Sequence, residues 1–179
     1  MITLNSEGVV FIHDHPGRVP TPTVPLPYTL RHFQKGDGPA WDALLDTAFG
    51  GRHERASLCS QTRRSQDLWV PERTHFAVLR GVPVSVATAC ETEWKGKPAG
   101  AFGWVGTHPE HRRKGLARAV CAACLLWLAK QGRSRVVVCT GPDLPGAIQL
   151  YLSLGFVPDT EAAHAAMKKM GLVPEEDGE

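Results

Sequence analysis

The sequence predicts an α/β (α+β) fold in which a mixed, mostly antiparallel central sheet is flanked by helices. The chain has 179 residues, 42% of them hydrophobic, which is enough for one well-buried core. Runs typical of strands alternate with runs whose apolar residues recur at helical spacing, and Gly and Pro separate them. Three strand-like runs follow one another with only short turns between them, which predicts an antiparallel meander.

The chain divides into an N-terminal extension and a single main domain. We expect residues 1–27 to form a strand, GVVFI at 8–12, and then an extended proline-rich connector. Residues 28–179 form the main domain. Its predicted elements are strands at 28–33, 74–80, 84–94, 99–107, 134–140 and 156–157, and helices at 37–51, 52–68, 116–130, 145–155 and 160–170.

Each element has a local reason in the sequence. Pro39 suits the first turn of the first helix, and Gly50-Gly51 ends it. The polar segment 52–68 has only a weak helical pattern. Turns at GVP and KGKP join the strands of the meander, whereas VVVCT is apolar throughout, as in a strand buried on both faces. The helix at 116–130 has a wide apolar face, so the sheet must cover most of it.

Composition and charge argue against several classes of partner. The formal net charge is +2, and the cluster Arg112-Arg113-Lys114 has no interleaved aromatic residues, so we expect no nucleic-acid partner. The apolar run at 119–129 is too short to span a bilayer and the first residues lack a signal-peptide pattern, so we expect no membrane partner. Five cysteines, mostly among apolar neighbours, favour a reducing, cytoplasmic location.

The sequence gives no reason to expect a metal. Cys121 and Cys124 have the spacing of a zinc or redox pair, but no second pair accompanies them and their surroundings are an apolar helix. We therefore interpret them as core residues. The His13-Asp14-His15 motif has no further ligands in evidence.

The segment GWVGTHPEHRRKGLARAV, residues 103–120, has the features of an anion site. A strand ends at Thr107, a basic loop follows, and Gly115 opens a helix. The first amides of a helix lack internal partners, and together with the helix dipole they favour an anion such as phosphate. Gly115 and Ala117 leave the backbone accessible. A solvated loop is the alternative interpretation.

Two segments of the chain resemble the GNAT superfamily of N-acetyltransferases. THPEHRRKGLA resembles the family's Val-x-Pro strand end followed by Arg/Gln-x-x-Gly-x-Gly/Ala, and AIQLYLSLGF resembles its Ala-x-x-Leu-Tyr-x-x-x-Gly-Phe element. The resemblance covers about residues 28–160. It implies a GNAT-like sheet that splays between the fourth strand, here 99–107, and the fifth strand, here 134–140.

The resemblance also implies an activity. The chain would be an N-acetyltransferase, an acyltransferase that uses acetyl-CoA as co-substrate and moves the acetyl group to a primary amine by direct attack. A small molecule is the preferred acceptor, with a protein N-terminus or lysine as the alternative. A non-catalytic acyl-CoA sensor is the alternative from another functional class, and a homodimer is left open.

Site residues follow from the resemblance by position. The amide of Val105 would stabilise the oxyanion, and Tyr151 would be the general acid unless it is only a core residue. Glu91 and Glu93 would supply the base through water, against the alternative of a solvated hairpin end. The residues implied in acetyl-CoA binding are Val105, Gly106, Thr107, Arg112, Arg113, Lys114, Gly115, Leu116 and Ala117.

The chain departs from the family pattern at two places. Leu144 stands where many members have an Asn that contacts the CoA arm. The residues after Asp159 predict a helix rather than a last strand, and we expect GVVFI at 8–12 to take the place of that strand. The acceptor pocket is expected to draw on Trp41, residues 52–70, Phe102 and Trp104.

Overall fold

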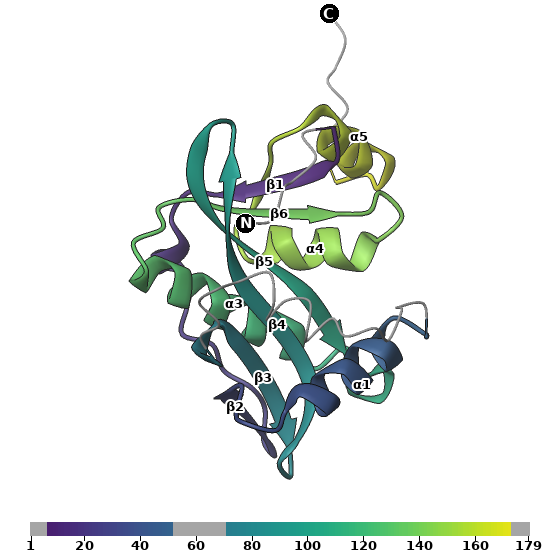
Figure 1. Cartoon of the computed structure of the whole chain (residues 1–179). Helices are drawn as coiled ribbons and strands as arrows, with labels where there is room; N and C mark the ends of the chain where they lie inside the picture. Colours follow the sequence, from purple (N-terminus) through teal and green to yellow (C-terminus); the bar gives the residue numbers. More distant parts are fainter. Residues whose placement is uncertain (1–6, 52–70, 173–179) are drawn as a thin grey trace, which may run out of the picture.

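The computed structural model describes residues 7–51 and 71–172 (Figure 1). It confirms the predicted elements within these ranges, while the helix predicted at 52–68 lies outside them. The strands are β1 (Val9–His13), β2 (Tyr28–His32), β3 (Thr74–Leu79), β4 (Val82–Trp94), β5 (Lys97–Thr107), β6 (Val136–Thr140) and β7 (Val157–Pro158). The helices are α1 (Gly38–Ala48), α3 (Leu116–Lys130), α4 (Pro145–Ser153) and α5 (Glu161–Lys169).

The seven strands form one sheet in the order β2-β3-β4-β5-β6-β1-β7. Among the described strands, β5 and β6 are the one pair that runs parallel, so the prediction of a mixed, mostly antiparallel sheet is confirmed. The N-terminal strand β1 lies between β6 and β7 and pairs antiparallel with both. It therefore completes this end of the sheet, as expected from the absence of a last strand in the sequence.

The sheet opens between β5 and β6. The two strands pair only at Gly100 with Val136 and at Ala101 with Val137, near their first residues. Beyond this point β5 continues to Thr107, where it pairs with β4 alone. The predicted splay is therefore seen in the strand pairing, and the gap separates the meander β2-β3-β4-β5 from the group β6-β1-β7 (Figure 1).

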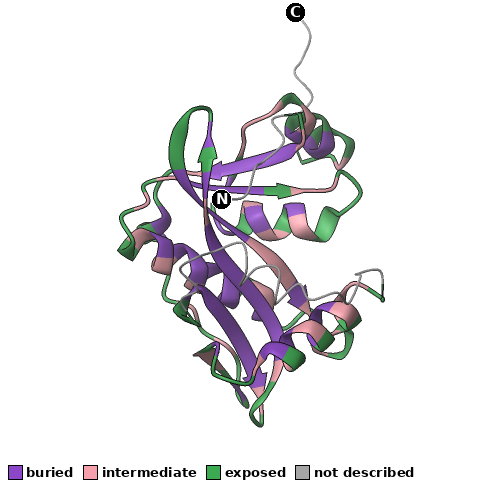
Figure 2. Cartoon of the chain, viewed as in Figure 1, coloured by how far each residue is buried: buried purple, intermediate pink, exposed green. Residues whose placement is uncertain are grey.

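Helices cover both faces of the sheet. Buried residues of α3, α4 and α5 share one large core cluster with alternate residues of the strands, including Val120, Ile148 and Met167. On the other face α1 packs Trp41 and Leu45 against β3 and β4 in a smaller cluster. Figure 2 shows buried residues running along the central strands, with exposed residues at the turns.

The cysteine pair of α3 belongs to this core. Cys121 and Cys124 are fully buried, and burial raises the pKa of both thiols, so neither resembles a reactive or metal-binding pair. The four cysteines in the described part of the chain are all free. Within the same residues, none of the helices is long and apolar enough to cross a membrane.

Candidate functional site

A cleft of about 1350 Å³ lies where β5 and β6 part. One wall consists of β5, the loop after it and the first turn of α3, and the other consists of β6 and α4. The end of α1 closes one side. Eight of the nine residues predicted to bind the cofactor line this cleft, namely Val105, Gly106, Thr107, Arg112, Arg113, Gly115, Leu116 and Ala117.

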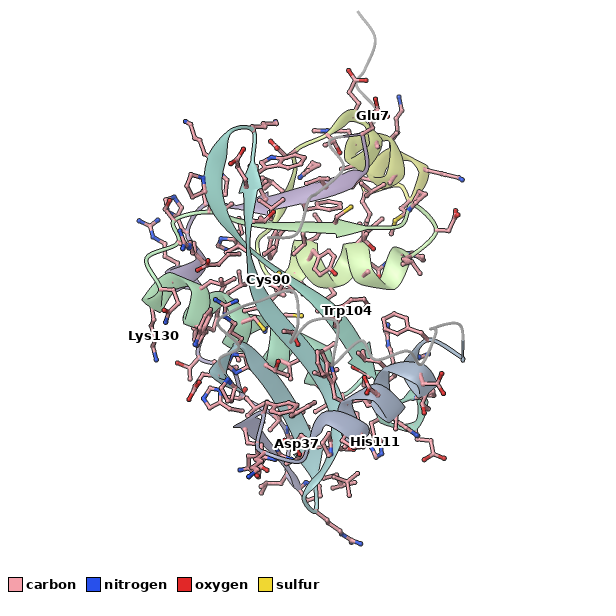
Figure 3. The ribbon with its side chains drawn as sticks, in the orientation of Figure 1. Glu7, Asp37, Cys90, Trp104, His111 and Lys130 are labelled. Atoms are coloured by element: carbon pink, nitrogen blue, oxygen red, sulfur yellow. The ribbon has the colours of Figure 1, made fainter. Side chains whose placement is uncertain are left out.

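A β-bulge shapes the β5 wall. The register of β4 with β5 shifts so that Trp104 and Val105 together stand opposite Ala87. Trp104 has a φ of 53°, an uncommon backbone conformation for a bulky residue. Its side chain packs toward the α1 side of the sheet (Figure 3). Such a bulge redirects the backbone next to a site, and here it lies beside the opening of the sheet.

The backbone of β5 after the bulge turns its polar groups alternately toward β4 and toward the cleft. The His108 amide donates to the Val84 carbonyl at 2.9 Å, so this residue faces β4. Since the direction alternates along a strand, Thr107 and Val105 direct their amides and carbonyls away from β4 and toward the cleft. An extended ligand arm could pair with this edge as an added strand does.

Gly106 lets α1 approach the same wall. A Cβ atom at this position would lie 2.9 Å from the Leu45 side chain and 3.2 Å from Ala48. The side chains of α1 therefore fill the space beside Gly106, and a residue with a Cβ atom would clash with them. Gly106 holds α1 close to the strand that lines the cleft.

The start of α3 presents free amides to the cleft. Gly115 has a φ of 76° and no side chain caps the helix, so the first backbone N–H groups keep their donor capacity. The backbone of Arg113 is also in the left-handed region, with a φ of 63°, so the loop curls around the start of the helix. Such a curl of successive amides at a helix N-terminus is a binding site for phosphate-like anions. The requirement for Gly115 is conformational, because a Cβ there would meet no atom within 4 Å.

Two arginines tie this wall to neighbouring helix ends. The Arg112 side chain donates to the carbonyls of Thr107 at 3.2 Å and Ala48 at 2.7 Å, the latter at the end of α1. Arg118 donates to the Ser153 carbonyl at the end of α4, at 3.3 Å.

Arg113 is exposed and makes no hydrogen bond or ion pair with another described residue. Its charge is therefore available to an anion in the cleft.

Tyr28 on β2 holds the loop from the other side. Its hydroxyl hydrogen-bonds with Nδ1 of His111 at 2.9 Å and accepts from the Lys114 ammonium at 3.1 Å. Lys114 also donates to the Glu110 carbonyl at 3.3 Å. Lys114, predicted to bind the cofactor, thus directs its side chain to Tyr28 and is absent from the cleft lining. Sequence analysis missed Tyr28, because 83 residues separate it from His111 and no motif links them.

Tyr151 lies on the opposite wall, in α4. It lines the cleft and is only 6% exposed, with its ring among the aromatic rings of Phe11, Phe102 and Phe156 at centroid distances of 5.8–6.5 Å. Burial is the main cause that raises its pKa, so the hydroxyl keeps its proton at neutral pH. The structure thus brings Tyr151 to the same cleft as the predicted cofactor residues. Leu144, 53% exposed, also lines this wall.

Glu91 and Glu93 are not brought to the cleft. Glu91 ion-pairs with Arg133 just after α3, at 2.8 Å, and with Arg73 at 3.9 Å. Gly100, its partner on β5, faces Leu128 of α3, which places the Glu91 side chain on the α3 face. Alternation along β4 places exposed Glu93 on the same face.

The expected acceptor pocket is only partly reproduced. Phe102 and Trp104 line the cleft, whereas residues 52–70 lie outside the described part of the chain. Trp41, on the sheet-facing side of α1, is fully buried and packs near Phe33, so its expected place in the pocket is wrong. The helical spacing that suggested Trp41 instead reflects the packing of α1 on the sheet. Cys139, which sequence analysis interpreted only as apolar, is exposed and lines the cleft.

Comparisons with known proteins agree with this geometry. The model of the acetyltransferase (GNAT) family matches residues 40–156. A mycothiol acetyltransferase from Thermobispora bispora is 34% identical over 145 residues, which cover 77% of this chain and 49% of that protein. Another from Acidothermus cellulolyticus is 30% identical over 155 residues, covering 76% and 47%. The chain therefore spans about half the length of the curated relatives it matches.

Solved structures share the fold. A GCN5-related N-acetyltransferase from Sphaerobacter thermophilus superposes with a TM-score of 0.66 at 25% identity, over 84% of this chain and 48% of that one. An aminoglycoside N-acetyltransferase solved in complex with CoA superposes with a TM-score of 0.62 at 20% identity, over 75% and 90%. With the matched family model and the splayed sheet, the chain belongs to the GNAT family of acetyltransferases.

Proposed function

We propose that the chain transfers an acetyl group from acetyl-CoA to the primary amine of a small molecule. One observation carries the proposal: a single cleft joins the uncapped start of α3 to the buried hydroxyl-bearing ring of Tyr151. The first feature suits a pyrophosphate and the second suits proton transfer. The distance along the cleft between them is bridged by the free edge of β5.

Acetyl-CoA would bind mainly to the β5 wall. The amides from Arg113 to Ala117 would hold the pyrophosphate, since the Arg112 amide donates to the Pro109 carbonyl at 3.3 Å, and the guanidinium of Arg113 would be an added cation. The pantetheine arm would lie along Val105 and Thr107 as an extra strand. The Thr107 carbonyl already accepts a hydrogen bond from the Arg112 side chain. The Thr107 amide is therefore the backbone group of this residue that can still bond to the pantetheine arm.

The chemical step would be a direct attack on the thioester. The amine nitrogen forms a bond to the acetyl carbonyl carbon, and the resulting oxyanion is stabilised by the amide of Val105. The carbon–sulfur bond then breaks, and the hydroxyl of Tyr151 gives its proton to the departing thiolate. The attacking nitrogen releases its surplus proton to solvent, and a proton taken up from solvent restores the Tyr151 hydroxyl. The raised pKa of Tyr151 keeps that proton available across the physiological range.

Deprotonation of the acceptor would take place in solvent. An amine arrives as an ammonium and must lose one proton before it can attack. Glu91 and Glu93 lie on the α3 face, and Glu91 is neutralised by two arginines, so the proposal gives neither residue that role. The open cleft would admit the amine in its neutral form.

The acceptor class is a further part of the proposal. The curated relatives are called mycothiol acetyltransferases, so an amine precursor of mycothiol is the first acceptor to test. Acetylation of a protein N-terminus or lysine and non-catalytic acyl-CoA sensing are the rivals. The free thiols among the described residues favour a reducing compartment such as the cytoplasm.

A thiol-release assay tests the proposal. Acetyl-CoA is incubated with the chain and a panel of amines that includes mycothiol precursors, aminoglycosides and peptides, and free CoA is measured. We expect turnover with a small amine. Turnover with peptides alone would favour the protein acetyltransferase, and calorimetric binding without CoA release across the panel would favour a sensor. Absence of acetyl-CoA binding at millimolar concentration would refute all three.

A further inference from the structure

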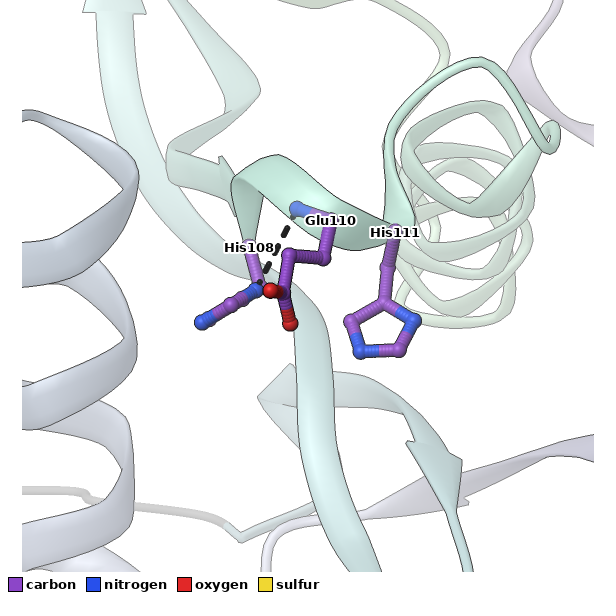
Figure 4. Close-up of side chains that lie close together, drawn as sticks. All are labelled: His108, Glu110 and His111. Atoms are coloured by element: carbon purple, nitrogen blue, oxygen red, sulfur yellow. Dashed lines mark hydrogen bonds between the residues drawn. The ribbon is translucent and has the colours of Figure 1, made fainter.

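Three side chains able to bind a metal gather on the loop between β5 and α3. Figure 4 shows the Glu110 carboxylate between the imidazoles of His108 and His111. One donor atom from each residue lies within 4.8 Å of the other two. We propose that His108, Glu110 and His111 bind one divalent transition-metal ion at the rim of the cleft.

The donor spacing requires only small adjustments. Three atoms within 4.8 Å of one another always leave a point that is no more than about 2.8 Å from each of them. Zinc–nitrogen and zinc–carboxylate bonds are about 2.0–2.2 Å long, so each donor must move by less than about 1 Å. Side chains that are exposed or half-buried, as these three are, can shift by this amount.

The backbone and one neighbour fix the arrangement in advance. A short 3-10 turn, Pro109–His111, sets the spacing, and the His111 amide donates to the His108 carbonyl at 2.9 Å. Tyr28 is a buried residue, 8% exposed, and its hydroxyl hydrogen-bonds with Nδ1 of His111 at 2.9 Å. The other ring nitrogen then faces the Glu110 carboxylate (Figure 4). Metal-binding histidines are commonly oriented in this way by a partner on the second nitrogen.

The donor set selects the class of metal. Two imidazoles with one carboxylate suit Zn²⁺, Co²⁺ or Ni²⁺, whereas Mg²⁺ and Ca²⁺ prefer oxygen ligands. Solvent reaches all three side chains, so water can complete the coordination. The Lys114 ammonium, 3.3 Å from the Glu110 carbonyl, opposes a second cation. We therefore expect weaker binding than at a buried structural zinc site.

The position of the ion should make metal binding and acetyl-CoA binding strengthen each other, an inference that rests on the proposed function. Pro109 and His111 line the cleft, and the amides proposed to hold the pyrophosphate follow shortly after them. A doubly charged cation at this rim would attract the phosphates. By linkage, acetyl-CoA would then raise the affinity for the metal by the same factor as the metal raises the affinity for acetyl-CoA.

Metal titrations of the whole chain, without acetyl-CoA, test the site. Co²⁺ binding is followed by its visible absorption and Zn²⁺ binding by calorimetry, after the protein has been freed of metal with a chelator. We expect one ion per chain, and at least a tenfold loss of affinity in His108→Ala and Glu110→Gln. His15→Ala is the matched control, because His13-Asp14-His15 is another place where two histidines flank a carboxylate in the sequence.

Each outcome decides the proposal. Saturable binding that His108→Ala and Glu110→Gln weaken and His15→Ala does not would support it; circular dichroism checks that all three variants fold. No binding up to millimolar metal, or binding that only His15→Ala weakens, would overturn it. In a second arm, Zn²⁺ should tighten acetyl-CoA binding at least threefold, and Glu110→Gln should abolish this change. An unchanged affinity would refute the coupling, whereas failure of acetyl-CoA to bind at all would refute the proposed function and leave the metal titrations standing.

Discussion

The two walls of the cleft are built by different means. The β5 wall offers backbone amides and cations, and side-chain ties such as Arg112 to Ala48 and Tyr28 to His111 hold it in place. The wall of β6 and α4 offers the hydroxyl of Tyr151 in an aromatic cluster with Phe102 and other rings. The first arrangement suits recognition of a phosphate-bearing ligand, and the second suits a single proton transfer.

This difference means that the two walls should affect different kinetic constants. A change on the β5 wall should alter acetyl-CoA affinity, because its groups meet parts of the cofactor that do not react. A change at Tyr151 should alter kcat, because the charge it neutralises develops only in the transition state. The following variants test this separation, from the largest expected effect to the smallest.

Tyr151→Phe should lower kcat at least about 100-fold, as expected when a general acid is removed. Burial of the ring among Phe11, Phe102 and Phe156 is retained, so the Km for acetyl-CoA should stay within about twofold. Because the pKa of Tyr151 is raised by burial, the wild-type kcat should not fall from loss of this proton below pH 10.

Steady-state kinetics with the best amine, at several pH values, check the Tyr151 prediction. Phe156→Leu is a control for aromatic packing, because it disturbs the same cluster without removing a hydroxyl. A kcat unchanged in Tyr151→Phe would show that this wall contributes packing alone, and the contrast between the walls would break down.

Arg113→Ala should raise the Kd for acetyl-CoA about tenfold, which corresponds to about 1.4 kcal/mol. Its guanidinium lines the cleft and has no partner among the described residues, so its loss removes a charge without breaking the fold. Calorimetry measures the change, and kcat at saturation should be preserved. Lys130→Ala, an exposed cation at the far end of α3, is the matched control. Equal effects of the two variants would indicate only a general charge effect.

Tyr28→Phe should raise the Km for acetyl-CoA about threefold, because its hydrogen bonds with His111 and Lys114, each worth about 1 kcal/mol, no longer hold the loop. The ring stays in the core cluster of buried residues to which Tyr28 belongs, so its apolar packing is kept. Kinetics and thermal unfolding are measured together. A fall in melting temperature with an unchanged Km would show that Tyr28 stabilises the fold without positioning the loop.

The fold was largely predictable, because its information is local. The helix at 116–130 and the strand VVVCT are specified by apolar residues that recur within a few positions. The position of β1 followed from an indirect argument, since the chain has an apolar strand at its start and none at its end. The bulge at Trp104 could not be predicted, because it depends on the register with β4.

The site was predictable where the chain itself brings residues together. Gly115 and Ala117 lie within one helix turn, and both line the cleft. The hydrogen bonds that hold the β5 wall join residues far apart in the sequence, such as Arg112 and Ala48. No sequence pattern indicates that such residues are in contact. Glu91 shows the opposite case: its place near the end of a strand was predicted, whereas its distance from the cleft depends on which face of the sheet α3 covers.

Glu91→Gln should leave kcat and both Km values within about twofold, because Glu91 lies on neither wall. The variant loses the ion pairs with Arg133 and Arg73, but the carboxylate is 44% exposed, which limits the loss to about 1 kcal/mol or less. Thermal unfolding should therefore shift by no more than about 2–4 °C. A fall in kcat together with a shift of the acid limb of the pH profile would restore Glu91 as the base. Cleft residues would then work with a group on the α3 face, and the reaction could not be divided between the two walls alone.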